Sequence, residues 1–193
     1  INNTAIGIGT LGSNTTGNNN TAVGGYALSA NTASNITAVG YAALDAHTTG
    51  TDCTGVGAHA LGANTTGANN TAVGKDTLQA NTTALDANTT GGRNTACGTG
   101  SLGTNTTASD NIAVGFDALF ANTTGSENVA IGSFALDANT TGNQITAVGF
   151  SALGKNTTGA QSVAVGYHAL SSNTTGNYNT AVGRIALDNV TTG

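Results

Sequence analysis

Apolar and polar positions along this chain follow a repeating unit of 17 residues. Each unit contains a glycine that directly follows Val, Ile or Cys and precedes a leucine by four positions. Eight of the ten intervals between these anchor glycines are 17 residues long, one is 16 and one is 24. The anchor glycines are Gly7, Gly24, Gly40, Gly57, Gly74, Gly98, Gly115, Gly132, Gly149, Gly166 and Gly183. A repeat of constant length predicts one supersecondary unit per copy, stacked on its neighbours.

The three residues before each anchor glycine predict a short β-strand. The first is Thr, Val or Ile, the second is Ala or Gly, and the third is Val, Ile or Cys, as in the run from Thr21 to Val23. Alternation of β-branched and small residues has the period of two that a strand with one buried face shows. We expect the β-branched residues to face the core.

The leucine after each anchor glycine predicts a second short strand, in which it is the core residue. The unit then closes with Asn-Thr-Thr-Gly, as at Asn64 to Gly67, where Gly permits a positive φ and Asn suits a tight corner. Two strands and two corners make one coil. The core residues predicted from this pattern are Val23, Leu28, Val39, Leu44, Val73, Leu78, Val114, Leu119, Val148, Leu153, Val182 and Leu187.

We therefore predict an all-β fold, a parallel β-solenoid (β-roll) whose coils form a single repeat array over residues 1–193. A helical fold is disfavoured because each unit contains several Gly, Thr and Asn residues, and the patterns of leucine-rich, ankyrin and propeller repeats are absent. The 24-residue interval arises because the near-copy ALDANTT follows TLQANTT directly. We expect this insertion, Ala84 to Thr90, to bulge from one corner and to leave the neighbouring strands in register.

The two ends of the sequence occupy consecutive phases of the repeat. Ile1 stands six residues before its anchor glycine, and Gly193 stands ten after the last one. Solenoids normally hide their open edges with polar caps, and neither end departs from the repeat. We expect either a segment of a longer array or copies that stack end to end into a fibre.

The run Asn-Val-Ala-Ile-Gly from Asn128 to Gly132, with its variants Asn-Thr-Ala-Val-Gly, resembles the head repeats of YadA-like trimeric autotransporter adhesins. The array also looks like those of bacterial and phage tail-fibre-like proteins. The resemblance covers the whole chain, although the unit is longer than the usual head repeat and adds the regular Leu and the Asn-Thr-Thr-Gly corner. It implies a left-handed β-roll, three of which associate side by side.

Composition and charge exclude several classes of function. Charged residues make up 7% of the chain, the net charge is -5, and only four residues are Lys or Arg, so no basic stripe exists for nucleic acid. No apolar run approaches the roughly 18 residues of a membrane span. The steady supply of Val, Ala and Leu argues against disorder. We expect no nucleic-acid partner and no membrane insertion within this span.

No catalytic or metal-ligating constellation stands out, and we predict that the chain is not an enzyme and takes no metal or cofactor. Cys53 and Cys97 fall two coils apart, too far for an easy disulfide, and should be unpaired. The histidines are expected at the surface or at corners: His47, His59 and His168. A solvated charged face is expected for the acids that follow the leucine, and for the equivalent acid of the insertion: Asp45, Asp86, Asp137 and Asp188.

The Asn-Thr-Thr corners match the acceptor pattern for N-glycosylation. The alternative is a ladder of Asn side chains that hydrogen-bond along the axis beside a ladder of Thr. We favour the ladder, and glycosylation stays open. The corner asparagines are Asn14, Asn64, Asn81, Asn88, Asn105, Asn122, Asn139, Asn156 and Asn173.

Aromatic residues recur directly after the anchor glycine, at Tyr41, Phe116, Phe150 and Tyr167. They predict an apolar face for contact between chains or with a ligand. We therefore expect an extracellular or cell-surface structural protein, a fibre or adhesin shaft whose partners are copies of itself, end to end or side by side. The alternatives are an adhesin head module that binds host or surface glycans, and an ice-binding solenoid. Ice binding is disfavoured because adjacent corner threonines point to opposite sides and give one rank only.

Overall fold

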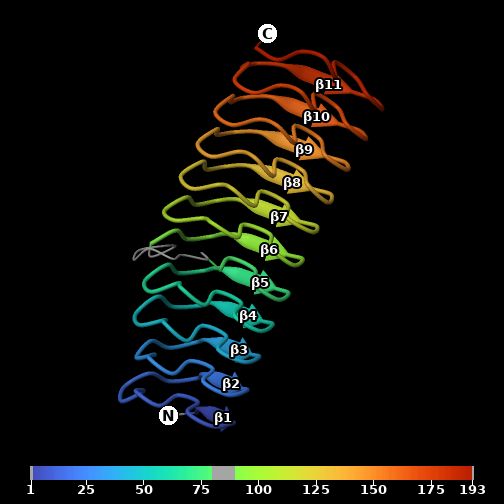
Figure 1. Cartoon of the computed structure of the whole chain (residues 1–193). Helices are drawn as coiled ribbons and strands as arrows, with labels where there is room; N and C mark the ends of the chain where they lie inside the picture. Colours follow the sequence, from blue (N-terminus) through green and yellow to red (C-terminus); the bar gives the residue numbers. More distant parts are fainter. Residues whose placement is uncertain (1, 80–89, 193) are drawn as a thin grey trace.

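The computed structural model of the chain describes residues 2–79 and 90–192. Within these residues the fold is all-β, a parallel β-solenoid of about ten turns. Eleven strands form one sheet in the order of the sequence, from β1 to β11. Figure 1 shows the strands stacked in a single column, with one coil of chain per strand and with the two termini at opposite ends. The predicted fold class is confirmed.

All eleven strands are three residues long and end directly before an anchor glycine. They are β1 (Thr4–Ile6), β2 (Thr21–Val23), β3 (Thr37–Val39), β4 (Thr54–Val56), β5 (Thr71–Val73), β6 (Thr95–Cys97), β7 (Ile112–Val114), β8 (Val129–Ile131), β9 (Thr146–Val148), β10 (Val163–Val165) and β11 (Thr180–Val182). Each strand pairs with the next at equivalent repeat positions, as Ala147 pairs with Ala164. The repeat in the sequence is therefore also the register of the sheet.

The sheet continues across the long interval of the sequence. β5 and β6 pair in register, with Thr71 opposite Thr95 and Val73 opposite Cys97. The prediction that the flanking strands keep their register is confirmed. The bulge predicted for the insertion at 84–90 lies, except for Thr90, outside the described residues.

The strands bury their small residue and expose the β-branched ones, which reverses the predicted orientation. The central Ala of β2, β3 and β5 to β10 is fully buried, whereas Val39 is 36% exposed and Val182 is 70% exposed. The reason is the narrow interior. At Gly55, which replaces the strand Ala in β4, an added Cβ would lie 3.1 Å from Cδ1 of Leu44, so the space opposite the leucine admits a methyl group and little more. The core prediction was therefore wrong for Val23, Val39, Val73, Val114, Val148 and Val182, which are half-buried or exposed.

The leucines fill the interior as predicted, but they do not lie in strands. Leu28, Leu44, Leu78, Leu119 and Leu153 are fully buried, whereas Leu187 in the last coil is half exposed. All of them have a positive φ, for example 54° at Leu44, which is a left-handed conformation that branched side chains rarely adopt. The predicted second strand is therefore wrong, and each described coil has one strand followed by a turn that points its leucine inward.

The anchor glycines are required by close contact between coils. Gly149 has a φ of 129°, and a Cβ placed there would lie 2.5 Å from the carbonyl oxygen of Gly166 in the next coil. No side chain fits in that space. The invariant glycine of the repeat thus fixes the turn that follows each strand.

Candidate interaction surface

The corner asparagines form a buried ladder along the axis. Asn122 Nδ2 donates to Oδ1 of Asn105 in the preceding coil (3.1 Å) and to the carbonyl of Gly125 (2.9 Å). In turn Asn122 Oδ1 accepts from Asn139 Nδ2 (3.0 Å). Beside this ladder, Thr123 Oγ1 donates to the carbonyl of Thr140 (3.0 Å). The predicted Asn and Thr ladders are confirmed.

Because their side-chain amides are buried, the corner asparagines do not fit the role of N-glycosylation acceptors in the folded chain. Glycosylation would need an exposed side-chain nitrogen, and here that nitrogen already donates hydrogen bonds inside the fold. The buried corner asparagines are Asn64, Asn105, Asn122, Asn139, Asn156 and Asn173. Asn14, in the first corner, is half-buried and donates to the carbonyl of Gly17. The other two predicted acceptors, Asn81 and Asn88, lie outside the described residues.

A second buried row of asparagines lies four positions before the anchor glycine, and sequence reasoning missed it. Asn111 Nδ2 donates to the carbonyl of Gly125 (3.0 Å), and its Oδ1 accepts from the backbone N–H of Asn128 in the next coil (2.9 Å). Ile36 and Ile145 occupy the same position in other coils and are also buried. That exchange of Asn for Ile was the signal in the sequence, since an apolar residue in a polar row indicates an interior site.

His47 takes the place of an asparagine in the corner ladder, so it lies at a corner as predicted, and it is fully buried. Its Nε2 lies 2.5 Å from the carbonyl of Gly50, and its Nδ1 lies 3.2 Å from Asn64 Nδ2. The same Nδ1 also lies 3.1 Å from the backbone carbonyl of Asn64, so each ring nitrogen faces a carbonyl acceptor. Burial lowers the pKa of His47 below its ordinary value of 6.5. Asn64 Oδ1 has no hydrogen-bond partner among the described residues.

Exposed or half-buried rings pack against one another along one side of the solenoid. We name as the ring ladder the residues Tyr26, Tyr41, His59, Phe116, Phe134, Phe150, Tyr167 and His168. Their neighbouring ring centroids lie 4.3 to 6.0 Å apart, the range in which aromatic pairs attract each other. The four predicted aromatics, Tyr41, Phe116, Phe150 and Tyr167, are all exposed members.

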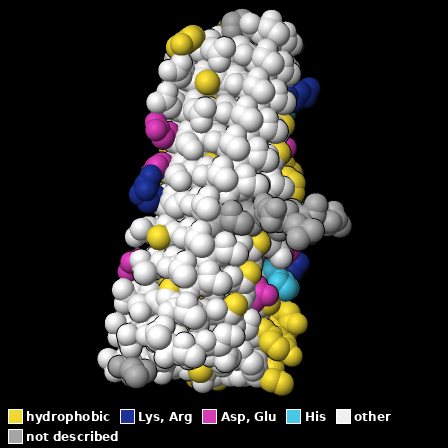
Figure 2. All heavy atoms as spheres, turned by 90° about the vertical axis from the view of Figure 1, so that its left-hand side faces the viewer, with side chains coloured by type: hydrophobic (Ala, Val, Ile, Leu, Met, Phe, Trp, Pro, Cys, Tyr) yellow, Lys and Arg dark blue, Asp and Glu magenta, His cyan; other side chains and the backbone are white. Residues whose placement is uncertain are grey.

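The ring ladder lies beside the outward-facing residues of the strands. The residue directly before the anchor glycine forms a rank of Val and Ile that runs along the sheet, with Cys97 as one member. Figure 2 shows a face almost without hydrophobic or charged side chains, and hydrophobic side chains gather along its margin, most densely near the N-terminal end. The molecule thus has a polar side and an apolar side, and the apolar side is the candidate interaction surface.

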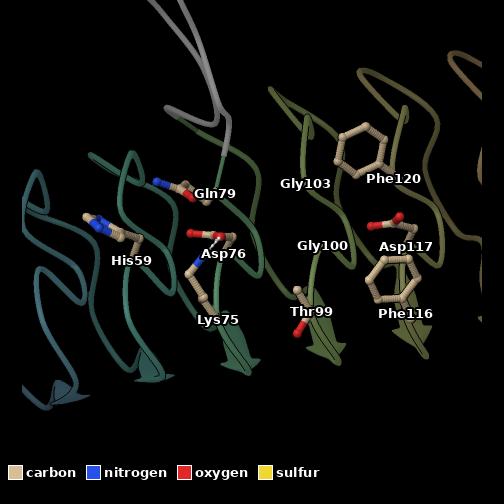
Figure 3. Close-up of a pocket in the computed structure, with 10 residues that line it drawn as sticks. All are labelled: His59, Lys75, Asp76, Gln79, Thr99, Gly100, Gly103, Phe116, Asp117 and Phe120. Atoms are coloured by element: carbon tan, nitrogen blue, oxygen red, sulfur yellow. Dashed lines mark ion pairs between the residues drawn. The ribbon is translucent and has the colours of Figure 1, made fainter.

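The ring ladder is interrupted in the coil of Gly74, where Lys75 and Asp76 follow the glycine, and in the coil of Gly98. The two residues after Gly98 are Thr99 and Gly100, and a hollow of about 480 Å³ opens between the flanking coils. Figure 3 shows His59, Lys75 and Asp76 on one side of the hollow and Phe116 on the other. The sequence contains the small residues, but only the stacking of coils places the four side chains around one space.

The recurrent acids after the leucine are half-buried, not on a fully solvated face as predicted. Burial raises the pKa of Asp45 and of Asp137, and Asp188 accepts a hydrogen bond from Ser171 Oγ. Asp86 lies outside the described residues. Cys53 is buried and Cys97 exposed, and both are free thiols as predicted.

The described residues contain neither a candidate metal-binding group nor a candidate membrane-spanning helix. No group of three or more His, Cys, Asp or Glu side chains in residues 2–79 and 90–192 is placed to hold a metal ion. The same part of the chain contains no helix that is long and apolar enough to cross a membrane.

Comparison of the chain with protein-family models, with curated proteins and with solved structures finds no match. The resemblance to YadA-like head repeats therefore stays a prediction from the motif, and so do the left-handed coil and the trimer that it implies.

Proposed function

We propose that this chain is a non-catalytic structural protein that forms the shaft of an extracellular fibre or adhesin. The observation that carries the proposal is the identity of the contacts from coil to coil. Leucine packs in every coil, Asn122 bonds to Asn105 and Asn139, and the Thr123 hydroxyl bonds to the next coil in the same way. Because each coil holds its neighbours by the same bonds, stability accumulates along one axis and the product is a rod.

Lateral association between copies of the chain is the second part of the proposal. The ring ladder and the adjacent rank of Val and Ile give each solenoid a long apolar side, and Phe116 is 48% exposed. An exposed apolar stripe of this length favours burial against another surface. A second solenoid offers a stripe with the same spacing of about 4.8 Å per coil, so its rings can fit between those of the first.

Sedimentation velocity over a range of concentrations tests the lateral contact. Wild-type chain should sediment faster as concentration rises, and the triple substitution Phe116→Ser, Phe150→Ser and Tyr167→Ser should abolish this dependence. Tyr178→Ser is the matched control, because Tyr178 is 77% exposed and lies outside the ring ladder. A wild-type chain that stays monomeric at every concentration contradicts lateral association.

Ice binding is a second candidate, and the outward faces of the strands favour it. Thr21, Thr37 and Thr54 form part of one exposed or half-exposed rank, and the Val and Ile residues two positions later form another. Along a rank the side chains repeat at about 4.8 Å, and the two ranks are about 6.6 Å apart. The single-rank argument against ice binding concerned the corner threonines and does not apply to this face.

Thermal hysteresis measurements test this second candidate. An ice-binding chain should depress the freezing point below the melting point and facet growing ice crystals. Thr54→Tyr on the sheet face should remove both effects, whereas Thr49→Tyr at an exposed corner should retain them. Absence of hysteresis in the wild-type chain contradicts the candidate.

A further inference from the structure

The hollow at the interruption of the ring ladder has an apolar wall. Phe120 is the only aromatic residue at the position after the leucine, where other coils have Gly, Ser, Asp or Gln. Its ring lies over Gly103, so close that a Cβ on Gly103 would be 2.7 Å from it. Phe116 adds a second exposed ring from the same coil. Glycine at position 103 thus gives Phe120 the room to form this wall.

A carboxylate without a partner lies in the same wall. The Asp117 side chain extends over Gly100, as Figure 3 shows, and an added Cβ on Gly100 would collide with its Oδ1. No hydrogen bond or ion pair of this carboxylate occurs among the described residues, and partial burial raises the pKa of Asp117. The wall therefore presents an acceptor that a bound molecule can satisfy.

The opposite wall provides hydrogen-bond donors. Lys75 Nζ forms an ion pair with Asp76 (2.8 Å) and keeps 67% of its side chain exposed. Gln79 and Thr99 also line the hollow, together with His59, and their side chains can both donate and accept. The hollow, about 480 Å³ in volume, lies within the range of small-molecule sites.

We propose that this hollow binds a neutral polyhydroxylated ring, such as one sugar residue of a glycan. The apolar face of such a ring can stack on Phe116 or Phe120, while its hydroxyl groups donate to Asp117 and accept from the donors opposite. An organic cation would also suit the rings and Asp117, but the ion pair of Lys75 with Asp76 offers it no free carboxylate on the opposite wall, whereas hydroxyl groups can accept from Lys75. A free anion meets the carboxylates of both walls. This binding role goes beyond the shaft role and does not depend on association between chains.

Saturation-transfer difference NMR on the full chain tests the site, with D-glucose, D-galactose, D-mannose and N-acetyl-D-glucosamine as separate probes. We expect transfer to the ring C–H protons of at least one sugar, with a dissociation constant in the millimolar range. Thr99→Phe should abolish it by filling the hollow. The fold tolerates this change, because Phe116 and Phe150 occupy the equivalent position in other coils.

Two further variants separate loss of the site from loss of the fold. Phe120→Ser should weaken binding about three- to tenfold through loss of one stacked ring, and other coils have Ser at this position, as at Ser29. Phe150→Ser should bind like the wild type, because Phe150 belongs to the ring ladder but does not line the hollow.

Three results would overturn the proposal. The first is an absence of saturation transfer from all four sugars. The second is transfer that persists unchanged in Thr99→Phe. The third is binding of tetramethylammonium chloride, but of no sugar, that is lost in Asp117→Asn, which would assign the hollow to cations. Each result is independent of the sedimentation experiment, so the failure of the site and the failure of the shaft are distinguishable.

Discussion

At the scale of single residues, each coil depends on backbone conformations that most side chains avoid. The anchor glycines have φ values near 130°, and the leucines four positions later have φ values near 50°. A leucine in this conformation is costly by about 1 to 2 kcal/mol, which the burial of its side chain offsets at about 1.5 to 3 kcal/mol. At the anchor glycine, burial of a side chain cannot offset the cost of the positive φ, because the next coil occupies the space that a side chain would need.

Substitution of an anchor glycine and of a glycine outside the anchor position should show which glycines the close contact between coils requires. Gly149→Ala should destabilise the fold by about 3 kcal/mol or more, because its Cβ would meet the backbone of Gly166 at 2.5 Å. Gly154→Ala should change stability by less than about 1 kcal/mol, since its neighbours lie at 3.2 Å or beyond. Urea denaturation followed by circular dichroism gives both values. Equal effects would contradict the assigned role of the anchor glycine.

His47 makes the stability of the fold depend on pH. Its pKa in the folded chain lies below the ordinary value of 6.5 because burial disfavours the charged ring. The unfolded chain therefore binds the proton more readily, and the stabilisation that is complete above pH 6.5 is lost as the pH falls towards the folded-state pKa. The slope should reach at most about 1.4 kcal/mol per pH unit.

The expected result is a lower unfolding midpoint at about pH 5 than at about pH 7. His47→Asn should reduce this difference, because Asn31 and Asn64 occupy the same position in the adjoining coils and do not titrate. Thermal unfolding of the two proteins at both pH values is the measurement. An identical pH dependence in the variant would show that His47 does not carry the effect.

At the scale of one element, the hydrogen bonds that hold a coil extend well beyond its strand, because backbone bonds such as those from Leu119 N–H to the Ala135 carbonyl and from Thr123 N–H to the Thr140 carbonyl also join neighbouring coils. The strand has only three residues, and rows of Asn and Thr side chains add further bonds between coils, although Ile36 and Ile145 interrupt one of the Asn rows. Asn111 and Asn122 both donate to the carbonyl of Gly125. The polar interior is stable because nearly every buried side-chain nitrogen and oxygen in the described residues has a hydrogen-bond partner.

Removal of one amide from the corner ladder should therefore be costly. Asn122→Ala deletes the bonds to Asn105 and Gly125 and removes one of the two acceptors of Asn139 Nδ2, which still donates to the carbonyl of Gly142, for an expected loss of about 2 to 4 kcal/mol. Thr124→Ala, at an exposed position two residues away, should cost less than about 0.5 kcal/mol. Denaturation midpoints compare the two variants. A small effect for Asn122→Ala would mean that the ladder is not a main source of stability.

Sequence periodicity predicted the coil, its register and the Asn and Thr ladders, but not the orientation of the strand. Alternation alone cannot distinguish Ala inward from Val inward, and hydrophobicity favoured Val. The narrow space opposite Leu44 reverses that choice, and it is a property of the stacked coils. In the same way, the left-handed φ of the leucines and the hollow beside Phe116 depend on packing between coils, which no single unit of the sequence contains.

At the scale of the whole molecule, the solenoid has a polar side and an apolar side. The face of Figure 2 is polar with few charges, and the ring ladder with the Val and Ile rank lies on the apolar side. With one coil per about 4.8 Å, about ten turns extend about 48 Å. A rod with one apolar side along this length suits a shaft that is built from several parallel chains.

Electron cryomicroscopy of the purified chain at rising concentration shows whether parallel chains associate into such a shaft. We expect elongated particles with an axial repeat of about 4.8 Å and, at high concentration, a width greater than that of one solenoid. Compact particles without that repeat, or rods that never associate, would contradict the proposed shaft.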